Sequence, residues 1–297
     1  TSNSKYNVYK FIFSFMILLF TWILINHKIK PNAIIQKNIQ NKFWSKKVDK
    51  IKYDLIIAGD SRVYRGISAQ ILENQLGLSS YNLGLSSAIY DSKYLDLISH
   101  KIDNRGIVIL GLTSHSLASN KQNDHLLELK QKYQNKNSDD LFSIFTKMEI
   151  KDFKKLFKFK SSSSSYHQEY NNDGWVASWK DDYTESAIEK YKTIFKNFEF
   201  EYDVIEKLCE FKNDNNGLLF YAFRIPSSSK MEILEDNLST IDFKEVKNRM
   251  IECGYSWLEF KNSSNYESYD ASHLDKTSAI QLSKELAQKL QLSSSEI

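Results

Sequence analysis

Short apolar runs alternate with helix-like stretches along most of this chain, and that alternation restricts the possible folds more than any other feature. The strongest run is 106–112, with sequence GIVILGL, and shorter runs occupy 53–58, 80–83, 217–223 and 255–260. Segments with helical spacing of apolar residues separate them. Strands joined by helices form right-handed crossovers, and therefore a parallel sheet with helices on both faces. We expect a flavodoxin-like, doubly wound α/β domain with five parallel strands.

Three of the intervening stretches predict helices. Residues 68–76 form one candidate, with Ser68 at the N-cap, and residues 89–102 form a second. Residues 277–292 close the chain as an amphipathic helix capped by Asp275 or Thr277. We expect these helices to cover the faces of the sheet.

Residues 113–216 add no clear strand and are interpreted as a helical insertion. They contain the serine run 161–165 and an aromatic-rich piece, 166–183, with the sequence Asn-Asn-Asp-Gly-Trp at 171–175. We expect the insertion to lie over the carboxyl edge of the sheet, where α/β proteins place their ligands.

An uncharged apolar segment, FIFSFMILLFTWILI, occupies residues 11–25. With the residues before it, the stretch reaches about 18 positions, at the short end for a membrane-spanning helix. A cleaved signal peptide is the alternative, but no small-residue cleavage site follows the segment. We expect one N-terminal membrane anchor within 1–30, a connector over 31–52 and the main domain over 53–297. By the positive-inside rule, the lysines after the segment favour a cytoplasmic main domain. Charge bias is a weak criterion, however, and by itself it leaves the topology open.

Composition excludes several classes of protein. Gly (9) and Pro (2) are too scarce for a collagen-like or disordered chain. The net charge of +3 gives no concentrated basic surface for nucleic acid. Two cysteines exclude a disulfide scaffold and a multi-Cys zinc site, and the histidines show no metal-ligand spacing, so we predict no metal and no cofactor. We expect Cys209 and Cys253 to be buried free thiols, with an oxidised pair as the alternative.

The first candidate for chemistry is Gly59-Asp60-Ser61-Arg62, directly after the first soluble strand. A serine at this turn lies at the carboxyl edge of the sheet, where backbone N–H groups face a ligand. The alternative is a turn in which Asp60 or Ser61 only caps the next helix.

The second candidate is Asp270-Ala271-Ser272-His273, just before the last helix. A serine nucleophile needs a base to accept its proton, and the base needs a carboxylate to fix its tautomer. Asp270 and His273 have suitable spacing for that pair. A surface loop with a solvated histidine is the alternative.

Two further loops fall at the same predicted edge. Asn82-Leu83-Gly84 follows the second strand, and Gly111-Leu112-Thr113-Ser114 follows the third. Acyl transfer needs N–H donors aimed at the developing oxyanion, and the N–H groups of Ser61 and Gly84, with a donor from the Thr113 turn, are the candidates. Four such loops in this order are far more specific than any one of them.

With these motifs the chain resembles the SGNH/GDSL hydrolase superfamily over about residues 53–292. The resemblance implies the SGNH hydrolase fold, with Ser61 as nucleophile, His273 as general base and Asp270 as its orienting carboxylate. One block departs from the pattern, because the usual Gly-x-Asn-Asp is here Gly111-Leu112-Thr113-Ser114. Loss of one oxyanion donor typically costs about 2.7–4 kcal/mol of transition-state stabilisation, unless His115 or Asn82 donates instead.

The overall plan is also similar to membrane-anchored SGNH-like proteins related to the D-alanyl-lipoteichoic-acid protein and the alginate acetylation proteins. This similarity implies a bacterial, extracytoplasmic serine esterase or O-acyltransferase that acts on acyl esters of a polysaccharide or cell-envelope polymer through an acyl-serine intermediate. It also implies a membrane-bound O-acyltransferase as a partner.

Several side chains are candidates for substrate binding. Arg62 and Arg65 could bind an anionic acceptor, and Arg224 reaches the same edge. Trp175 and neighbouring aromatic residues could stack on sugar rings or form the core of the insertion. The candidate binding residues are thus Arg62, Asn82, Trp175 and Arg224.

Two other functions stay open at this point. The first is a non-catalytic SGNH-like protein that binds the polymer or serves as a scaffold for a membrane-bound O-acyltransferase. The second is a cytoplasm-facing α/β domain in which Gly59-Asp60-Ser61 binds a phosphate at a helix N-terminus.

Overall fold

A computed structural model describes most of the chain. The described residues are 12–18, 21, 38–118, 124–134, 166–196, 202–239, 241–260 and 265–294. The chain divides into two compact units, Thr1–Phe43 and Trp44–Ile297, and the account below concerns the second. The predicted membrane segment, 11–25, lies mostly outside the described residues. Within the part that is described, no helix has both the length and the apolar character needed to cross a membrane.

The core of the second unit is a five-stranded sheet in which every neighbouring pair is parallel. Its strands, in spatial order, are β2 (Ser80–Asn82), β1 (Tyr53–Gly59), β3 (Ile102–Leu112), β6 (Leu219–Arg224) and β7 (Ser256–Trp257). Counted along the chain among these five strands, the order is 2-1-3-4-5, so the first strand lies inside the sheet. The prediction of an α/β fold with five parallel strands is confirmed.

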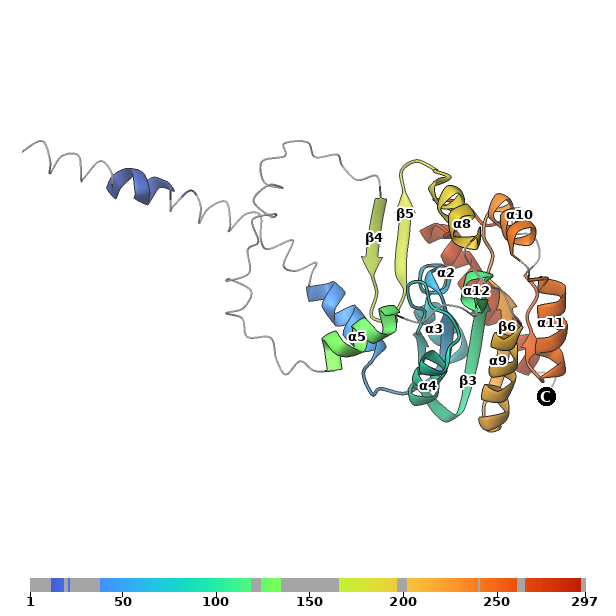
Figure 1. The fold of residues 1–297 in the computed structure, drawn as a ribbon. Coiled ribbons are helices and arrows are strands. Elements are labelled where there is room, and N and C mark those ends of the chain that lie inside the picture. The colour runs from blue at the N-terminus through green and yellow to red at the C-terminus, as the bar shows by residue number, and fades with distance from the viewer. Residues whose placement is uncertain are drawn as a thin grey trace, which may run out of the picture. The chain divides into compact units, whose positions relative to one another are not determined.

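Alternate side chains of the strands enter two separate apolar clusters. On β1, Leu55 and Ile57 belong to one cluster, whereas Ile56 and Ala58 belong to the other. The first cluster is completed by α3 (Ala69–Leu76) and α12 (Lys276–Ser294), and the second by α4 (Ser92–Lys101), α9 (Asp203–Asp214) and α11 (Phe243–Glu252) (Figure 1). Both faces of the sheet are therefore covered by helices, as a parallel sheet requires.

The insertion contains two strands that the sequence did not indicate. An antiparallel hairpin of β4 (Tyr166–Tyr170) and β5 (Val176–Lys180) forms a separate sheet. The remaining elements are α2 (Ser61–Gly66), the single turn η1 (His115–Leu117), α5 (Asp124–Gln134), α8 (Ser186–Lys196) and α10 (Ser229–Leu238). The prediction that 113–216 contains no clear strand is wrong. β4 could not be recognised because its sequence, YHQEY, shows no apolar alternation and the strand is only partly buried.

The tip of this hairpin is fixed to the carboxyl end of β2. The carbonyl of Asp173 accepts from the N–H of Asn82 (2.8 Å), and its carboxylate accepts from the Ser68 hydroxyl (3.1 Å) and the Gln70 N–H (2.8 Å). Gly174 has φ +84°, and a Cβ there would lie 2.0 Å from the Asn82 carbonyl oxygen. Only glycine allows this approach, and the hairpin is therefore attached beside the loop that follows β2.

Residues just before β1 pack on the same region. The Lys47 ammonium is fully buried and donates to the carbonyls of Asn82 and Gly174 (2.8 Å for the latter). The Trp44 ring meets the Tyr64 ring of α2 edge to face, with centroids 5.9 Å apart. Residues 44–47 thus belong structurally with the domain, although they fall inside the predicted connector, 31–52.

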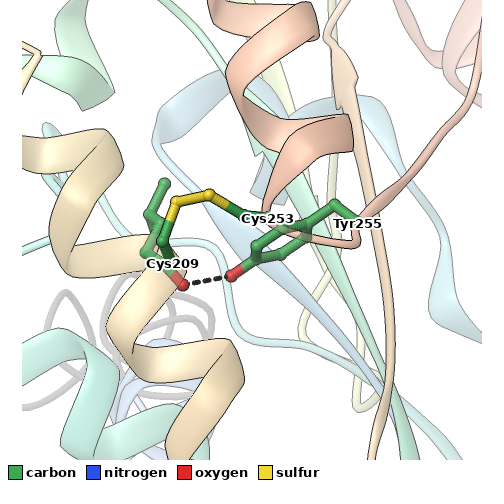
Figure 2. Close-up of a disulfide and its surroundings, with 4 residues drawn as sticks. Cys209, Cys253 and Tyr255 are labelled. Carbon is green, nitrogen blue, oxygen red and sulfur yellow. Dashed lines mark hydrogen bonds between the residues drawn. A yellow bond between two sulfur atoms is a disulfide. The ribbon is translucent and has the colours of Figure 1, made fainter.

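A disulfide joins Cys209 in α9 to Cys253, which directly follows α11 (Figure 2). The two Cα atoms are 5.4 Å apart, and the Tyr255 hydroxyl donates to the carbonyl of Leu208 (2.7 Å) beside the bridge. The prediction of free thiols is wrong. The sequence places the cysteines 44 positions apart, and only the packing of α9 against α11 on the sheet brings them together.

Removing the disulfide by the double substitution Cys209→Ser and Cys253→Ser is expected to lower the free energy of unfolding by about 2–4 kcal/mol, because the unfolded chain gains freedom. Urea unfolding of the two proteins, with and without a reductant, measures the difference. The reductant should lower the midpoint of the parent protein and leave that of the double variant unchanged. An unchanged midpoint for the reduced parent would contradict the bridge.

Candidate active site

A sharp turn after β1 places Ser61 at the carboxyl edge of the sheet. Gly59 has φ +154°, and a Cβ there would lie 2.3 Å from the Val63 side chain, so the turn requires glycine. Asp60 is the N-cap of α2, because its carboxylate accepts from the Arg62 N–H (2.9 Å). Asp60 therefore caps the helix as the simpler interpretation expected, while Ser61 remains partly accessible to solvent.

Ser61, His273 and Asp270 form a continuous chain of hydrogen bonds. The Ser61 Oγ and His273 Nε2 are 2.9 Å apart, and His273 Nδ1 lies 2.9 Å from Asp270 Oδ2. Ser61 and His273 are separated by 212 positions and meet because both follow the sheet at its carboxyl edge. The structure thus brings together the three residues that the sequence proposed as a catalytic triad, in the geometry of a nucleophile, a base and an orienting carboxylate.

The Asp270 carboxylate is held by the backbone of its own loop. Its Oδ1 accepts from the N–H groups of Ser272 (3.0 Å) and His273 (2.8 Å), and Ala271, directly after Asp270, has φ +73°. Burial alone would raise the pKa of Asp270, but His273 and these N–H donors outweigh burial and hold that pKa well below its ordinary value. Asp270 is therefore a fixed anion beside the imidazole.

His273 has a lowered pKa. Burial of the ring is the largest cause; Asp270 opposes it, and the positive charges of Arg65 and Arg62 lower the pKa further. The imidazole is therefore neutral at physiological pH, which is the state that accepts a proton from a serine.

Ester hydrolysis is expected to rise with pH as His273 loses its proton, with a midpoint below the ordinary histidine value of 6.5. A profile of kcat/KM from about pH 4 to about pH 8 checks this, and a midpoint above about pH 7 would contradict it. An unfolding profile over the same range serves as the control. The pKa of His273 is lower in the folded protein than in the unfolded chain, where it is near 6.5. The unfolded chain therefore binds the proton first, and the contribution of His273 to stability falls as the pH drops from 6.5 to the folded pKa.

A buried ion-pair network that the sequence did not reveal connects α2 to the loop that carries His273. Arg62 donates from Nη2 to Glu235 Oε1 (2.7 Å) and from Nε to the Ser272 hydroxyl (3.1 Å). Glu235 lies on α10, is fully buried, and also accepts from Arg224 (3.2 Å), which pairs in turn with Asp236 (2.9 Å). Arg62 thus ties α2, which begins with Ser61, to the loop that carries His273.

The four residues predicted to bind substrate have other roles in the structure. Arg62 is 2% exposed and paired with Glu235, so it does not face a ligand. The Asn82 amide is fully buried and donates to the carbonyls of Val63 (2.8 Å) and Ile67 (2.7 Å).

Trp175 and Arg224 are likewise held by protein groups. Trp175 is buried in the apolar cluster around α3, and its Nε1 donates to the Arg65 carbonyl (2.9 Å). The Arg224 guanidinium is partly exposed but ion-paired, and it lies 4.1 Å from the centroid of the Phe243 ring. Arg62, Asn82 and Trp175 thus have structural contacts within the protein, and their part in substrate binding stays a prediction.

Two of the three predicted oxyanion donors are occupied by protein partners. The Gly84 N–H donates to Asn82 Oδ1 (2.9 Å), and the Thr113 hydroxyl donates to Asp60 Oδ2 (2.8 Å). For the Ser61 N–H, no acceptor is found in the described parts of the chain. Of the predicted set, Ser61 is thus the donor that is available to an oxyanion.

Tyr269, which the sequence did not assign to the site, contacts His273, and its hydrogen-bond partner is Arg65, one of the candidates for binding an anionic acceptor. The Tyr269 ring stacks on the imidazole, with centroids 5.8 Å apart and planes 13° apart. The Tyr269 hydroxyl accepts from Arg65 Nη1 and lies 3.5 Å from the Tyr166 hydroxyl. The position of Tyr269 directly before Asp270 was the one signal in the sequence that could have indicated its role.

A depression of about 450 Å³ is lined in part by Tyr269. It is lined by residues from the end of β5 and from the loop around His273, and they carry both signs of charge: Trp179, Lys180, Asp181, Tyr183, Glu267, Ser268, Tyr269, Asp275, Lys276 and Thr277. Across the described ranges, no cluster of three or more His, Cys, Asp or Glu side chains has an arrangement that could hold a metal ion.

Comparisons with known proteins add little to these observations. No family model matches the chain, and no curated protein matches it. A solved structure from Streptococcus pneumonia, provisionally described as a platelet activating factor, is 11% identical, with a TM-score of 0.36 over 90% of this chain and 99% of the other. A likeness at this level carries no argument about fold or function here.

Proposed function

We propose that the protein is a serine esterase or O-acyltransferase with an SGNH-type hydrolase fold. One observation carries this proposal, namely the unbroken chain of hydrogen bonds from Ser61 through His273 to Asp270. The partial solvent access of Ser61 and the lowered pKa of His273 support it, since a nucleophile must be reachable and its base must be neutral.

The reaction would proceed in two steps. Ser61 Oγ attacks the ester carbonyl while His273 Nε2 takes the hydroxyl proton of Ser61. Asp270 stabilises the imidazolium that forms. Collapse of the tetrahedral intermediate expels the alcohol, which receives the proton from His273, and leaves an acyl-serine. Water or a sugar hydroxyl then attacks the acyl-serine while His273 takes its proton. The bond between the acyl group and Ser61 Oγ breaks, Ser61 regains the proton from His273, and the same site thus supports hydrolysis or transfer.

The developing oxyanion would be stabilised mainly by the Ser61 N–H. Use of the Gly84 N–H as a second donor would require its hydrogen bond to Asn82 to yield to the oxyanion. Because each oxyanion donor is worth about 2.7–4 kcal/mol, a site with one free donor is expected to be slow compared with a complete one.

The proposed substrate is an acyl ester on an extracytoplasmic polysaccharide or cell-envelope polymer, with a membrane-bound O-acyltransferase as partner. Support comes from the predicted N-terminal membrane anchor and from the similarity to membrane-anchored SGNH-like proteins. The Cys209–Cys253 disulfide adds to this, because disulfides persist mainly in oxidising compartments outside the cytoplasm. The disulfide thus favours an extracytoplasmic domain, whereas the distribution of lysines favours a cytoplasmic one.

The test is covalent labelling with a fluorophosphonate probe of protein truncated to begin at residue 31, with the modified residue located by mass spectrometry. Such probes react with a serine whose proton is removed by a neighbouring base. Label on Ser61 would support the proposal. A protein that is folded by circular dichroism and takes no label would contradict it.

One observation favours the second function, a non-catalytic protein that binds the polymer or serves as a scaffold. Both the Gly84 N–H and the Thr113 hydroxyl have partners within the protein, as in a site that no longer needs them for catalysis. Absence of labelling together with retained binding of the polymer would identify this function.

A further inference from the structure

The side chain of Arg65 differs in its partners from three other arginines of the described residues. Arg62, Arg224 and Arg249 each pair with a carboxylate within the protein. Arg65 makes no ion pair with any carboxylate of the described residues; instead, phenols accept its hydrogen bonds, namely Tyr64 at Nε (3.2 Å) and Tyr269 at Nη1.

The guanidinium of Arg65 stays charged in this environment. Burial would lower the pKa of Arg65, but the phenolic oxygens of Tyr64, Tyr269 and Tyr166 outweigh burial and raise it. The group also lies 5.3 Å and 5.8 Å from the centroids of the Tyr64 and Tyr166 rings. A cation that is largely withdrawn from water and has no internal counter-ion is costly unless an anion binds to it.

Arg65 also lies in the right place to contact a substrate. It is four positions after Ser61 on α2, so the two side chains occupy the same face of the helix, one turn apart. Its partner Tyr269 stacks on His273. No described residue accepts from Nη2, which leaves N–H groups for the paired hydrogen bonds that guanidinium makes to carboxylate and phosphate.

We propose that Arg65, framed by Tyr64, Tyr166 and Tyr269, is the subsite for an oxyanion, either a carboxylate or a phosphate, of the molecule that carries or receives the acyl group. This inference rests on the proposed function for its place in the reaction. Binding of the anion itself does not depend on that function. The acceptor polymer is therefore an anionic one, with its acidic group about one helical turn from the reacting ester.

An anion at Arg65 would also affect the base. The Arg65 charge lowers the pKa of His273, so a bound anion would offset that charge and make the imidazole a stronger base while substrate is present. The groups that face His273 are Asp270 on its own loop, Arg65 and Arg62 on α2, and the Tyr269 ring. Arg65 is the one charged member of this set without a carboxylate partner among the described residues.

Binding is tested with inorganic phosphate and with glucuronate, each titrated into the parent protein and followed by its thermal midpoint. The parent is expected to be stabilised by at least one of the two anions. Arg65→Gln should abolish that effect, Arg65→Lys should keep part of it, and Arg249→Gln, which removes the same charge from an exposed pair, should bind like the parent. No stabilisation of the parent by either anion, or equal stabilisation of Arg65→Gln, would overturn the proposal.

Catalysis is tested by comparing acetyl esters of a neutral sugar, of a uronic acid and of a sugar phosphate. The parent should prefer one of the charged esters, and Arg65→Gln should reduce that preference, measured as a ratio of kcat/KM values, roughly ten- to hundredfold. Equal preference in parent and variant would overturn the proposal. Anion binding without hydrolysis of any ester would refute the esterase function and leave the anion subsite standing.

Discussion

Ser61→Ala is expected to lower kcat for ester hydrolysis by about a million-fold, and His273→Ala by a similar factor, because a triad works as a unit. His273 lies 2.9 Å from both Ser61 and Asp270, which makes it the base in line with Ser61. Asp270→Asn should cost about 10⁴-fold, because an amide in place of the carboxylate favours the wrong tautomer of the imidazole. Initial rates on a simple acetyl ester measure all three.

The double variant Ser61→Ala with His273→Ala provides the control for this prediction. Its rate should match those of the single variants, because either change alone removes acyl-serine formation. Circular dichroism and urea unfolding should show that each protein is folded. Retention of a tenth or more of the parent rate by folded Ser61→Ala would show that the hydrolysis does not pass through this serine.

Glu235→Ala is expected to lower the free energy of unfolding by about 3–5 kcal/mol, which is the largest stability effect that we predict for a single substitution. The carboxylate is fully buried and is shared by Arg62 and Arg224, so its removal leaves a buried guanidinium without a counter-charge. Urea unfolding measures the change.

Asp236→Ala is the matched control for Glu235→Ala. It removes the next carboxylate on α10, which also pairs with Arg224 but is 55% exposed, and it should cost less than about 1 kcal/mol. The paired substitution of Arg62 by Met and Glu235 by Leu should cost less than Glu235→Ala alone, because no buried charge is left unpaired. Equal effects of the two alanine variants would show that Glu235 is not the partner on which the network depends.

The sheet could be predicted from the sequence because buried parallel strands are short apolar runs. β1, at Tyr53–Gly59, matches the predicted 53–58 almost to the residue. β3 begins at Ile102, whereas the predicted strand began at 106. The difference arises because Asp103–Arg105 are polar and exposed, and a hydrophobicity pattern assigns such residues to a loop. The predicted strand 255–260 pairs only over Ser256–Trp257, since the edge strand of a sheet needs few ladder bonds.

The candidate triad could be predicted because each of its residues lies beyond the carboxyl end of the sheet, where topology alone brings separate segments together. The supporting groups could not. Glu235 lies on a short helix among other charged residues, and a glutamate there ordinarily faces water. Arg62 and Arg65 are three positions apart with the same chemistry, and only their neighbours show that one is neutralised by Glu235 and the other has phenols around it.

If residues 11–25 anchor the protein as predicted, the attachment of Trp44 and Lys47 limits how far the candidate active site can lie from the membrane. The Trp44 ring contacts Tyr64 of α2, and the Lys47 ammonium donates to the Asn82 carbonyl. The segment that connects the predicted membrane segment to the domain therefore runs only from residue 25 to residue 44. Because residues 38–44 are helical, this segment would reach about 55 Å even with the residues before 38 fully extended. An anchored copy would therefore reach only substrates in a thin layer next to the bilayer.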